Sequence, residues 1–325
     1  MTTATQTEPT LADFQEARRY VAAHAYHTPL VTSRLLSEHT GFDVRLKAEM
    51  FQKTGSYKIR GPLNKFRHLT ADQRARGVIC SSAGNHAQGV ALAAAIYKMH
   101  AVVVMACNAT PSKVDATRSY GAEVVQHGVI WDEANEKARQ LTEERGLTYI
   151  HPFDDYQLMT GQGTVGLEIF QDFPEVDLVV VPIGGGGLIS GIAMALKASN
   201  PKIRIIGVES SGAPGMRRSI DEGHVVTLDK VDCVIDGLRV KRVGERTFSV
   251  VQRYVDDIVT LPDREIFDGL IWTMAHAKLV VEGAAAAPVA ALRKGLIKAP
   301  RGSKVVCVLS GGNVNLDQIK NLSWN

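Results

Sequence analysis

The sequence has no long hydrophobic run and no excess of charge of one sign. Apolar runs such as Ala101–Ala106 and Val305–Leu309 fall far short of the roughly 18 residues that a membrane helix needs. Lysine and arginine number 37 against 34 acidic residues, a net charge of +3, and the basic residues form no long run. Residues 1–10 lack the basic and then apolar pattern of a signal peptide. We therefore expect a cytoplasmic protein that binds neither membrane nor nucleic acid.

Cysteine is scarce: only four are present, and no two of them form a CxxC pair. Cys80, Cys107 and Cys307 lie within or at the end of apolar runs, which is typical of buried free cysteines. A disulfide framework or a structural zinc site is therefore not expected. With 45% hydrophobic and 22% charged residues, the composition is that of a folded globular protein, and the length of 325 residues predicts about two domains.

Short apolar segments alternate with segments of helical spacing along most of the chain. This alternation predicts a parallel sheet covered by helices, an α/β fold. Three strands and their helices form a compact block, and further strand-like segments lie on both sides of it. We therefore expect a small domain, residues 71–150, inserted into a larger one made of residues 1–70 and 151–325, with a cleft between them. The expected strands are 44–49, 78–81, 101–106, 122–127, 178–183, 203–208 and 305–309.

Two helices are predicted with particular buried or capping residues. One carries four apolar residues at helical spacing, which predicts a single buried stripe. These residues are Trp131, Ala134, Ala138 and Leu141. In the other helix, Asp263 is expected to be the N-cap that precedes an apolar face beginning at Ile266.

Four consecutive glycines follow the strand 178–183 and precede a helix-like stretch, 188–198. Glycines at such a turn let backbone N–H groups approach an anion, and the helix N-terminus adds a partial positive charge. The spacing matches neither the dinucleotide fingerprint nor the loop that binds nucleoside triphosphates. A monophosphate is therefore the ligand we expect at Gly184–Gly187.

Three further motifs carry side chains suited to chemistry. Lys58 lies between a glycine turn and a second glycine, next to Tyr57; partial desolvation would lower its pKa and suit it to Schiff-base formation, and a solvated surface lysine is the alternative. Ser81–His86 stands at a strand-to-helix junction, where it is either a helix cap or a set of N–H donors for a carboxylate. Ser310–Asn313 places a hydroxyl at the C-terminal end of a strand, the usual ligand edge of a parallel sheet.

Together these motifs resemble those of the threonine dehydratase and serine racemase family, which depends on pyridoxal 5'-phosphate (PLP). Phe51–Gly61 resembles the lysine motif of that family, and the resemblance runs from about His27 to the C-terminus. It implies the tryptophan-synthase-β-like fold, PLP fold type II, with two open α/β domains and the cofactor in the cleft between them. The other matching segments, in family order, are Ser82–Gln88, His151–Asp155, Gly161–Thr164, Val181–Gly187 and Ser310–Asn313.

The resemblance implies a role for each motif. Lys58 would hold PLP as a Schiff base and, once substrate has displaced it, would remove the proton from the substrate α-carbon. Tyr57 and Gly237 would cover the two faces of the ring, Asn85 would bind its 3-hydroxyl oxygen and Ser310 would meet its nitrogen. The phosphate would be bound by Gly184, Gly185, Gly186, Gly187 and Leu188. The substrate carboxylate would be bound by Ser82, Ala83, Gly84, Asn85 and His86.

The activity that the resemblance favours is β-elimination from L-threonine, L-serine or both, giving a 2-oxo acid and ammonia. Racemases of the family carry a serine where this sequence has Ala83, which has no proton to exchange. A neutral Ser310 would leave the ring nitrogen unprotonated, and this favours prompt elimination over transamination. Metal-stimulated racemases have two acids where this sequence has Glu209 and Gly215, so no metal is expected. A serine racemase or a non-catalytic PLP-binding protein is the alternative.

The substrate itself is less well defined. Arg239 would either pair with a second carboxylate, as in 3-hydroxyaspartate, or face solvent, and Tyr156 stands where the family often has proline. Phenylserine is a further possible substrate. The chain ends soon after Ser310–Asn313, which is typical of the short catabolic dehydratases, and a homodimer or homotetramer is expected.

Overall fold

The strands form two separate sheets in the computed structural model, which describes residues 7–314. The larger sheet has the order β1-β2-β10-β7-β8-β9 and the smaller has β5-β4-β3-β6. All strand pairs are parallel except β1 with β2. The larger sheet comprises β1 (Leu30–Thr32), β2 (Asp43–Ala48), β7 (Leu178–Pro182), β8 (Arg204–Ser210), β9 (Asp257–Leu261) and β10 (Lys304–Leu309). The smaller comprises β3 (Val78–Ser81), β4 (Ala101–Met105), β5 (Glu123–Gln126) and β6 (Thr148–Tyr149).

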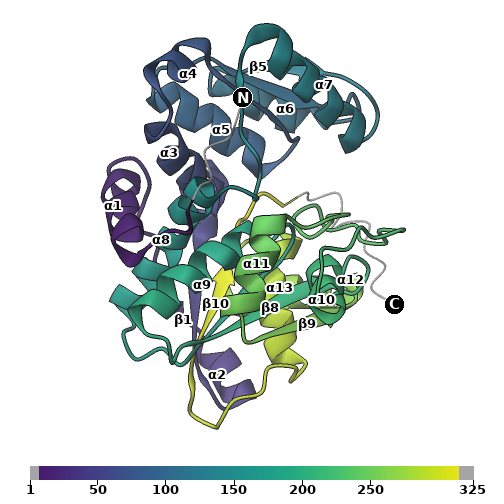
Figure 1. The fold of residues 1–325 in the computed structure, drawn as a ribbon. Coiled ribbons are helices and arrows are strands. Elements are labelled where there is room, and N and C mark those ends of the chain that lie inside the picture. Colours follow the sequence, from purple (N-terminus) through teal and green to yellow (C-terminus); the bar gives the residue numbers. More distant parts are fainter. Residues whose placement is uncertain (1–6, 315–325) are drawn as a thin grey trace.

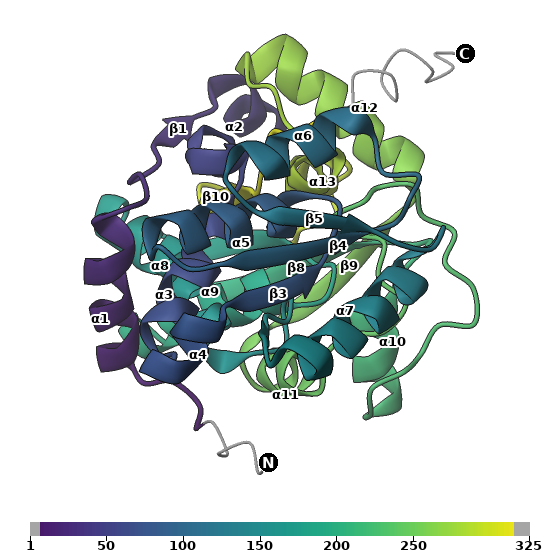
Figure 2. The ribbon, with the colours of Figure 1, turned by 90° about the horizontal axis from the view of Figure 1, so that it is seen from above.

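Helices connect most of the strands and surround both sheets (Figures 1 and 2). Three single turns, η1 (Glu49–Phe51), η2 (Lys53–Gly55) and η3 (Tyr57–Ile59), lead from β2 to α3, and a π turn, η4 (Thr273–Ala277), follows α12. The α-helices are α1 (Leu11–Ala22), α2 (Arg34–Thr40), α3 (Arg60–Arg67), α4 (Ala71–Arg76), α5 (Asn85–Ile96), α6 (Pro111–Ser119), α7 (Trp131–Arg145), α8 (Tyr156–Asp172), α9 (Gly187–Ser199), α10 (Gly215–Glu222), α11 (Glu245–Tyr254), α12 (Asp263–Trp272) and α13 (Gly283–Arg293).

Local sequence signals mark several helix ends. Thr10 and Thr70 each form a capping box at the start of α1 and α4, which satisfies backbone donors that the first turn leaves free. Pro111 is the first residue of α6, where its missing N–H is not needed. Three helices end at a glycine in the left-handed conformation: Gly41, Gly146 and Gly223.

The larger sheet is covered by helices on both faces. Along β7, Leu178 and Val180 belong to one core with residues of α12 and α13, while Val179 and Val181 belong to another with residues of α8 and α9. Both sets are buried. A strand covered on both faces has no polar side, and this explains the uniformly apolar run in the sequence.

The smaller sheet carries α5 on one face and α7 on the other. Its four strands all fall within residues 71–150, and Figure 1 shows them with α5, α6 and α7 above the larger sheet. The core beneath α5 also contains Leu63 and Phe66 of α3, which precede that range. The division of the chain at residues 70 and 150 remains a prediction.

Three local expectations are wrong. Trp131 is 51% exposed, because it is the first residue of α7, and its indole N–H donates to the carbonyl of Ser81 at the C-terminal end of β3. Asp263 is the first residue of α12 and not its N-cap; its carboxylate accepts from the N–H of Val234 at 2.7 Å and from a serine hydroxyl. Cys107 is exposed, because it lies in the turn after β4.

Over residues 7–314, no helix combines the length and the hydrophobicity needed to cross a bilayer.

Candidate functional site

Lys58 lies on η3, between the two sheets. The N–H of the preceding residue donates to the carbonyl of Ser310 at the end of β10, 3.1 Å away. On the other side of η3, the carbonyl of Lys58 lies very close to α5: a Cβ at Gly89 of α5 would lie 2.5 Å from that carbonyl oxygen. These two contacts fix the turn against the larger sheet on one side and against α5 on the other.

The amine of Lys58 is partly buried and has few partners. Its Nζ donates to the carbonyl of Pro152 at 3.0 Å, and no carboxylate of the described residues forms an ion pair with it. Burial lowers its pKa to about 8, an effect that the carboxylate of Glu282 partly opposes. An amine with this pKa is partly unprotonated near neutral pH and can act as a nucleophile or as a base.

The four glycines form the turn between β7 and α9, and their neighbours leave no room for side chains. A Cβ at Gly184 would lie 2.3 Å from the carbonyl of Gly237, and one at Gly185 would lie 2.2 Å from the ring of Phe153. Gly186 has φ +92°. The hydroxyl of Thr247 donates to the Gly185 carbonyl at 2.8 Å. The N–H groups at the start of α9 have no acceptor within the helix, so the turn is suited to an anion.

Asn85, the first residue of α5, is held by a carboxylate that the sequence analysis missed. Its Nδ2 donates to both oxygens of Glu282, at 2.8 and 2.9 Å, and its Oδ1 accepts from Asn313 at 2.8 Å. Burial raises the pKa of Glu282, while the hydrogen bond from Asn85 opposes that rise. The available signal was that Glu282 is the single acid within the otherwise apolar and small-residue run 279–287.

The predicted substrate loop lies between β3 and α5. Ser82, Ala83 and Gly84 are partly buried, and the hydroxyl of Ser82 accepts from the N–H of Gly84 at 3.2 Å. The Nε2 of His86 lies 3.1 Å from the carbonyl of Ile150, and burial lowers the pKa of this imidazole to about 3. A neutral imidazole that donates to a carbonyl has an acceptor at Nδ1. The donor that His86 offers to a carboxylate is therefore its main-chain N–H.

The remaining predicted residues lie at the edges of the same region. Ser310 is 3% exposed at the end of β10, next to the turn that carries Lys58. Tyr57 is partly buried, and burial raises its pKa. Gly237 contacts the glycine turn through its carbonyl. The adjacent residues Pro152 and Phe153 then link the lysine amine to the glycine turn, since one contacts Nζ and the other packs on Gly185.

The residues present fit a ligand that carries an aldehyde and a phosphate. The amine of Lys58 is available to an aldehyde, and the start of α9 is available to a phosphate. Buried polar atoms without a hydrogen-bond partner, which are rare in native proteins, occur in this region: Ser56 Oγ, His86 Nδ1 and both amide atoms of Gln162. PLP has both functional groups and therefore fits.

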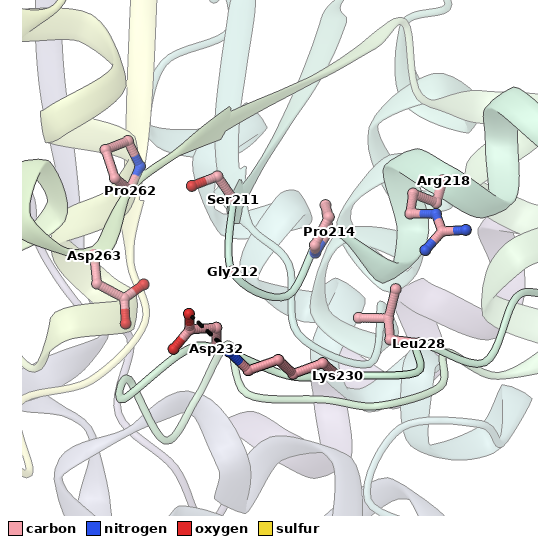
Figure 3. Close-up of a pocket in the computed structure, with 9 residues that line it drawn as sticks. All are labelled: Ser211, Gly212, Pro214, Arg218, Leu228, Lys230, Asp232, Pro262 and Asp263. Atoms are coloured by element: carbon pink, nitrogen blue, oxygen red, sulfur yellow. Dashed lines mark ion pairs between the residues drawn. The ribbon is translucent and has the colours of Figure 1, made fainter.

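Two other features are separate from these residues. A surface hollow of about 480 Å³ lies beyond the end of β8, between Ser211, Pro214, Arg218, Lys230, Asp232 and Asp263 (Figure 3). It includes none of the predicted site residues. The buried carboxylate of Glu209, whose pKa burial raises to about 8, accepts from the N–H groups of Met216 and Arg217, each at 2.8 Å. Both oxygens are thus used by the start of α10.

Comparisons with known proteins find close relatives of the chain as a whole. An L-threonine ammonia-lyase of Thermotoga maritima is 46% identical over 310 residues, 95% of this chain and 77% of that protein. The catabolic L-threonine dehydratase TdcB of Staphylococcus aureus strain N315 is 43% identical over 98% of this chain and 94% of its own. The structure of maize serine racemase matches with a TM-score of 0.92 at 35% identity, covering 97% of this chain and 96% of that one.

These matches confirm the α/β fold of PLP fold type II and PLP as the cofactor. The family described as pyridoxal-phosphate dependent enzyme matches residues 21–311, nearly the whole of the described chain. This chain belongs to that family and is a PLP-dependent lyase.

Proposed function

We propose that the enzyme removes the β-hydroxyl and the amino group of L-threonine, L-serine or both, giving a 2-oxo acid and ammonia. The observation that carries the proposal is the Lys58 amine with its lowered pKa: it donates to the carbonyl of Pro152, whose neighbour Phe153 packs on the glycine turn, and it lies within the electrostatic reach of Glu282. The relatives named for threonine deamination support it, since they are more than 40% identical over nearly the whole chain.

In this proposal the residues around Lys58 hold the cofactor. Asn85 would bind the 3-hydroxyl oxygen of the ring, Tyr57 and Gly237 would cover its faces, and Ser310 would donate to its nitrogen. The phosphate would lie on the turn from Gly184 to Leu188. When bound, PLP supplies a sink for negative charge at the substrate α-carbon.

Lys58 and the Ser82–His86 loop would act on the substrate. The loop offers main-chain N–H groups to the α-carboxylate, which orients the Cα–H bond. The unprotonated amine of Lys58, positioned by the Pro152 carbonyl, takes the Cα proton. The bond from the β-carbon to oxygen then breaks, and the departing hydroxide takes up one proton, which balances the proton removed from Cα, and leaves as water. The enamine that is released reacts with water outside the site to give the 2-oxo acid and ammonia.

A panel of β-hydroxy amino acids, assayed for 2-oxo acid and ammonia, tests this proposal. L-Threonine or L-serine should be the best substrate. Arg239 is exposed and its guanidinium forms no ion pair within residues 7–314, so nothing in its surroundings prevents it from binding a second carboxylate. A preference for 3-hydroxyaspartate or phenylserine would replace the substrate in the proposal. If no member of the panel yields a 2-oxo acid, the proposal is overturned.

Racemisation is the second candidate, because maize serine racemase matches the whole fold closely. A racemase needs a proton donor on the face opposite the lysine, and the position implied for it here is Ala83. We expect wild type to leave no inverted amino acid and Ala83→Ser to give detectable inversion, since a proton donor contributes typically about 10²–10⁴-fold. Chiral chromatography of the residual substrate decides this. Substantial D-amino acid from wild type would mean that another group protonates the far face.

The assembly and surroundings of the enzyme are further parts of the proposal. We propose a homodimer or homotetramer in the cytoplasm, with a small domain at residues 71–150, no metal ion and no nucleic-acid partner. The near-neutral charge balance, +3 over 325 residues, supports the last point. Light scattering after size exclusion gives the oligomeric state, and a monomeric mass would contradict it.

A further inference from the structure

The side-chain amide of Gln162 is a fully buried polar group without a partner. Gln162 is 0% exposed on α8, and neither Nε2 nor Oε1 has a hydrogen-bond partner among the described residues. Burying an amide in this way costs free energy unless something binds it. The amide is therefore a site that a ligand or an ordered water completes.

An unusually close contact between α8 and α9 places this amide. A Cβ at Gly163 would lie 2.5 Å from the carbonyl of Gly191, and a Cβ at Gly191 would lie 2.3 Å from the carbonyl of Met159. Because Gly163 and Gly191 let α8 and α9 approach so closely, the side chain of Gln162, next to Gly163, reaches the first turn of α9. A Cβ at Gly187 would lie 3.0 Å from its Oε1.

The start of α9 is itself incompletely satisfied. Its N-cap is Gly186, which has no side chain to accept from the first N–H groups of this 13-residue helix. The helix dipole adds partial positive charge at the same end. The free N–H groups of α9 and the side-chain amide of Gln162 therefore meet at the first turn of α9. Rotating that amide by 180° exchanges Oε1 for Nε2, which then directs its two hydrogens toward the free N–H groups' common ligand position.

We propose that Gln162 is a phosphate ligand of the cofactor, donating through Nε2 to a phosphate oxygen on the turn from Gly184 to Leu188. This inference rests on the proposed placement of the phosphate at that turn. It adds a side-chain donor to a set that otherwise consists of main-chain N–H groups. It also explains why an unpaired amide is kept in the core, where an apolar side chain would cost less.

The test compares two ligands on cofactor-free protein: PLP, and pyridoxal, which lacks the phosphate. Gln162→Met keeps the approximate volume and removes the donor. A hydrogen bond to a charged group is worth roughly a ten- to hundredfold change in affinity. We expect PLP to bind Gln162→Met weaker by that factor and pyridoxal to bind it as it binds wild type. Thr160→Val is the matched control, because that buried hydroxyl on α8 is already bonded to the Tyr156 carbonyl.

Equal losses of PLP and pyridoxal affinity in Gln162→Met, or no loss of either, would overturn the inference. If Gln162→Met does not fold, Gln162→Glu takes its place and should weaken PLP selectively, the more so at higher pH as the carboxylate ionises. Gly185→Ala separates the two proposals. If Gly185→Ala leaves the preference for PLP over pyridoxal intact, the phosphate does not lie on the glycine turn, and the proposed placement of the cofactor fails. If Gly185→Ala removes that preference but Gln162→Met does not, only the proposed role of Gln162 fails.

Discussion

One lysine of this enzyme is fully buried and another is partly buried, and their hydrogen-bond partners differ sharply. Lys47 of β2 is fully buried and donates to Glu168 at 2.6 Å and to the carbonyl of Thr28 at 2.7 Å. Lys58 donates to one carbonyl and forms no ion pair with any carboxylate of residues 7–314. Arg60, only two residues further on, binds both oxygens of Glu49 at 2.8 Å and also Glu168. An ion pair satisfies a buried cation, whereas burial without a paired carboxylate favours loss of the proton.

The same contrast extends to the groups around each lysine. Around Lys47, every charged group has an oppositely charged partner within the core. These ion pairs connect β2, η1, α3 and α8. In the region of the cofactor site, the amide of Gln162 at the start of α9 and the hydroxyl of Ser56 near Lys58 have no partner among the residues described. The satisfied cluster stabilises the fold next to the site, and the unsatisfied one is the part of the structure that a ligand completes.

The largest expected effect separates the two lysines by activity. Lys58→Ala should lose all turnover and the covalently held cofactor, while unfolding close to the denaturant midpoint of cofactor-free wild type, because the side chain has only one hydrogen bond to lose. Turnover with a panel substrate and the visible absorbance of the bound cofactor measure this. Full activity with an intact absorbance band would contradict the assignment.

The reverse pattern is expected at the other lysine. Lys47→Met should lower the free energy of unfolding by about 3–5 kcal/mol, because it leaves the two buried carboxylates of Glu49 and Glu168 sharing the single guanidinium of Arg60, with one negative charge uncompensated in the core. Its activity per folded molecule should stay near wild type. Guanidinium unfolding monitored by circular dichroism gives the stability. An unchanged midpoint would mean that the buried network does not stabilise the fold.

Ser310→Asp should change the balance of reactions without removing the cofactor. A carboxylate there would favour a protonated ring nitrogen, so negative charge at the substrate α-carbon would last longer. We expect elimination to slow roughly ten- to a hundredfold, the order that a hydrogen bond to a charged group contributes. Pyridoxamine phosphate, the product of side transamination, should rise and is measured by chromatography. Unchanged elimination with no transamination would show that Ser310 does not face the ring nitrogen.

The smallest effect concerns pH. In cofactor-free protein, capture of PLP requires the unprotonated amine, so its rate should rise as pH rises through about 8, the pKa of Lys58, and not through 10.5. Glu282→Gln removes a carboxylate that raises this pKa, so the midpoint should move to lower pH. Stopped-flow absorbance over a pH series measures both. A midpoint that moves upward in Glu282→Gln would contradict the electrostatic account of the site.

Much of the architecture could be predicted from the sequence, because buried parallel strands have a strong signal. Runs such as 178–183 and 305–309 contain no polar residue, and both are strands covered on two faces. Trp131 was misplaced because helical spacing defines a stripe but not where the stripe leaves the core. Glu282 and Gln162 were missed because their significance depends on contacts between distant segments, to Asn85 and to the start of α9.

The most direct test of the central claim is to find which lysine carries the cofactor. The enzyme loaded with PLP is reduced with borohydride, digested and mapped by mass spectrometry. Labelling confined to Lys58, and absent from the fully buried and ion-paired Lys47, is the predicted result. Labelling of any other lysine in an enzyme that still eliminates water from its substrate would contradict the account.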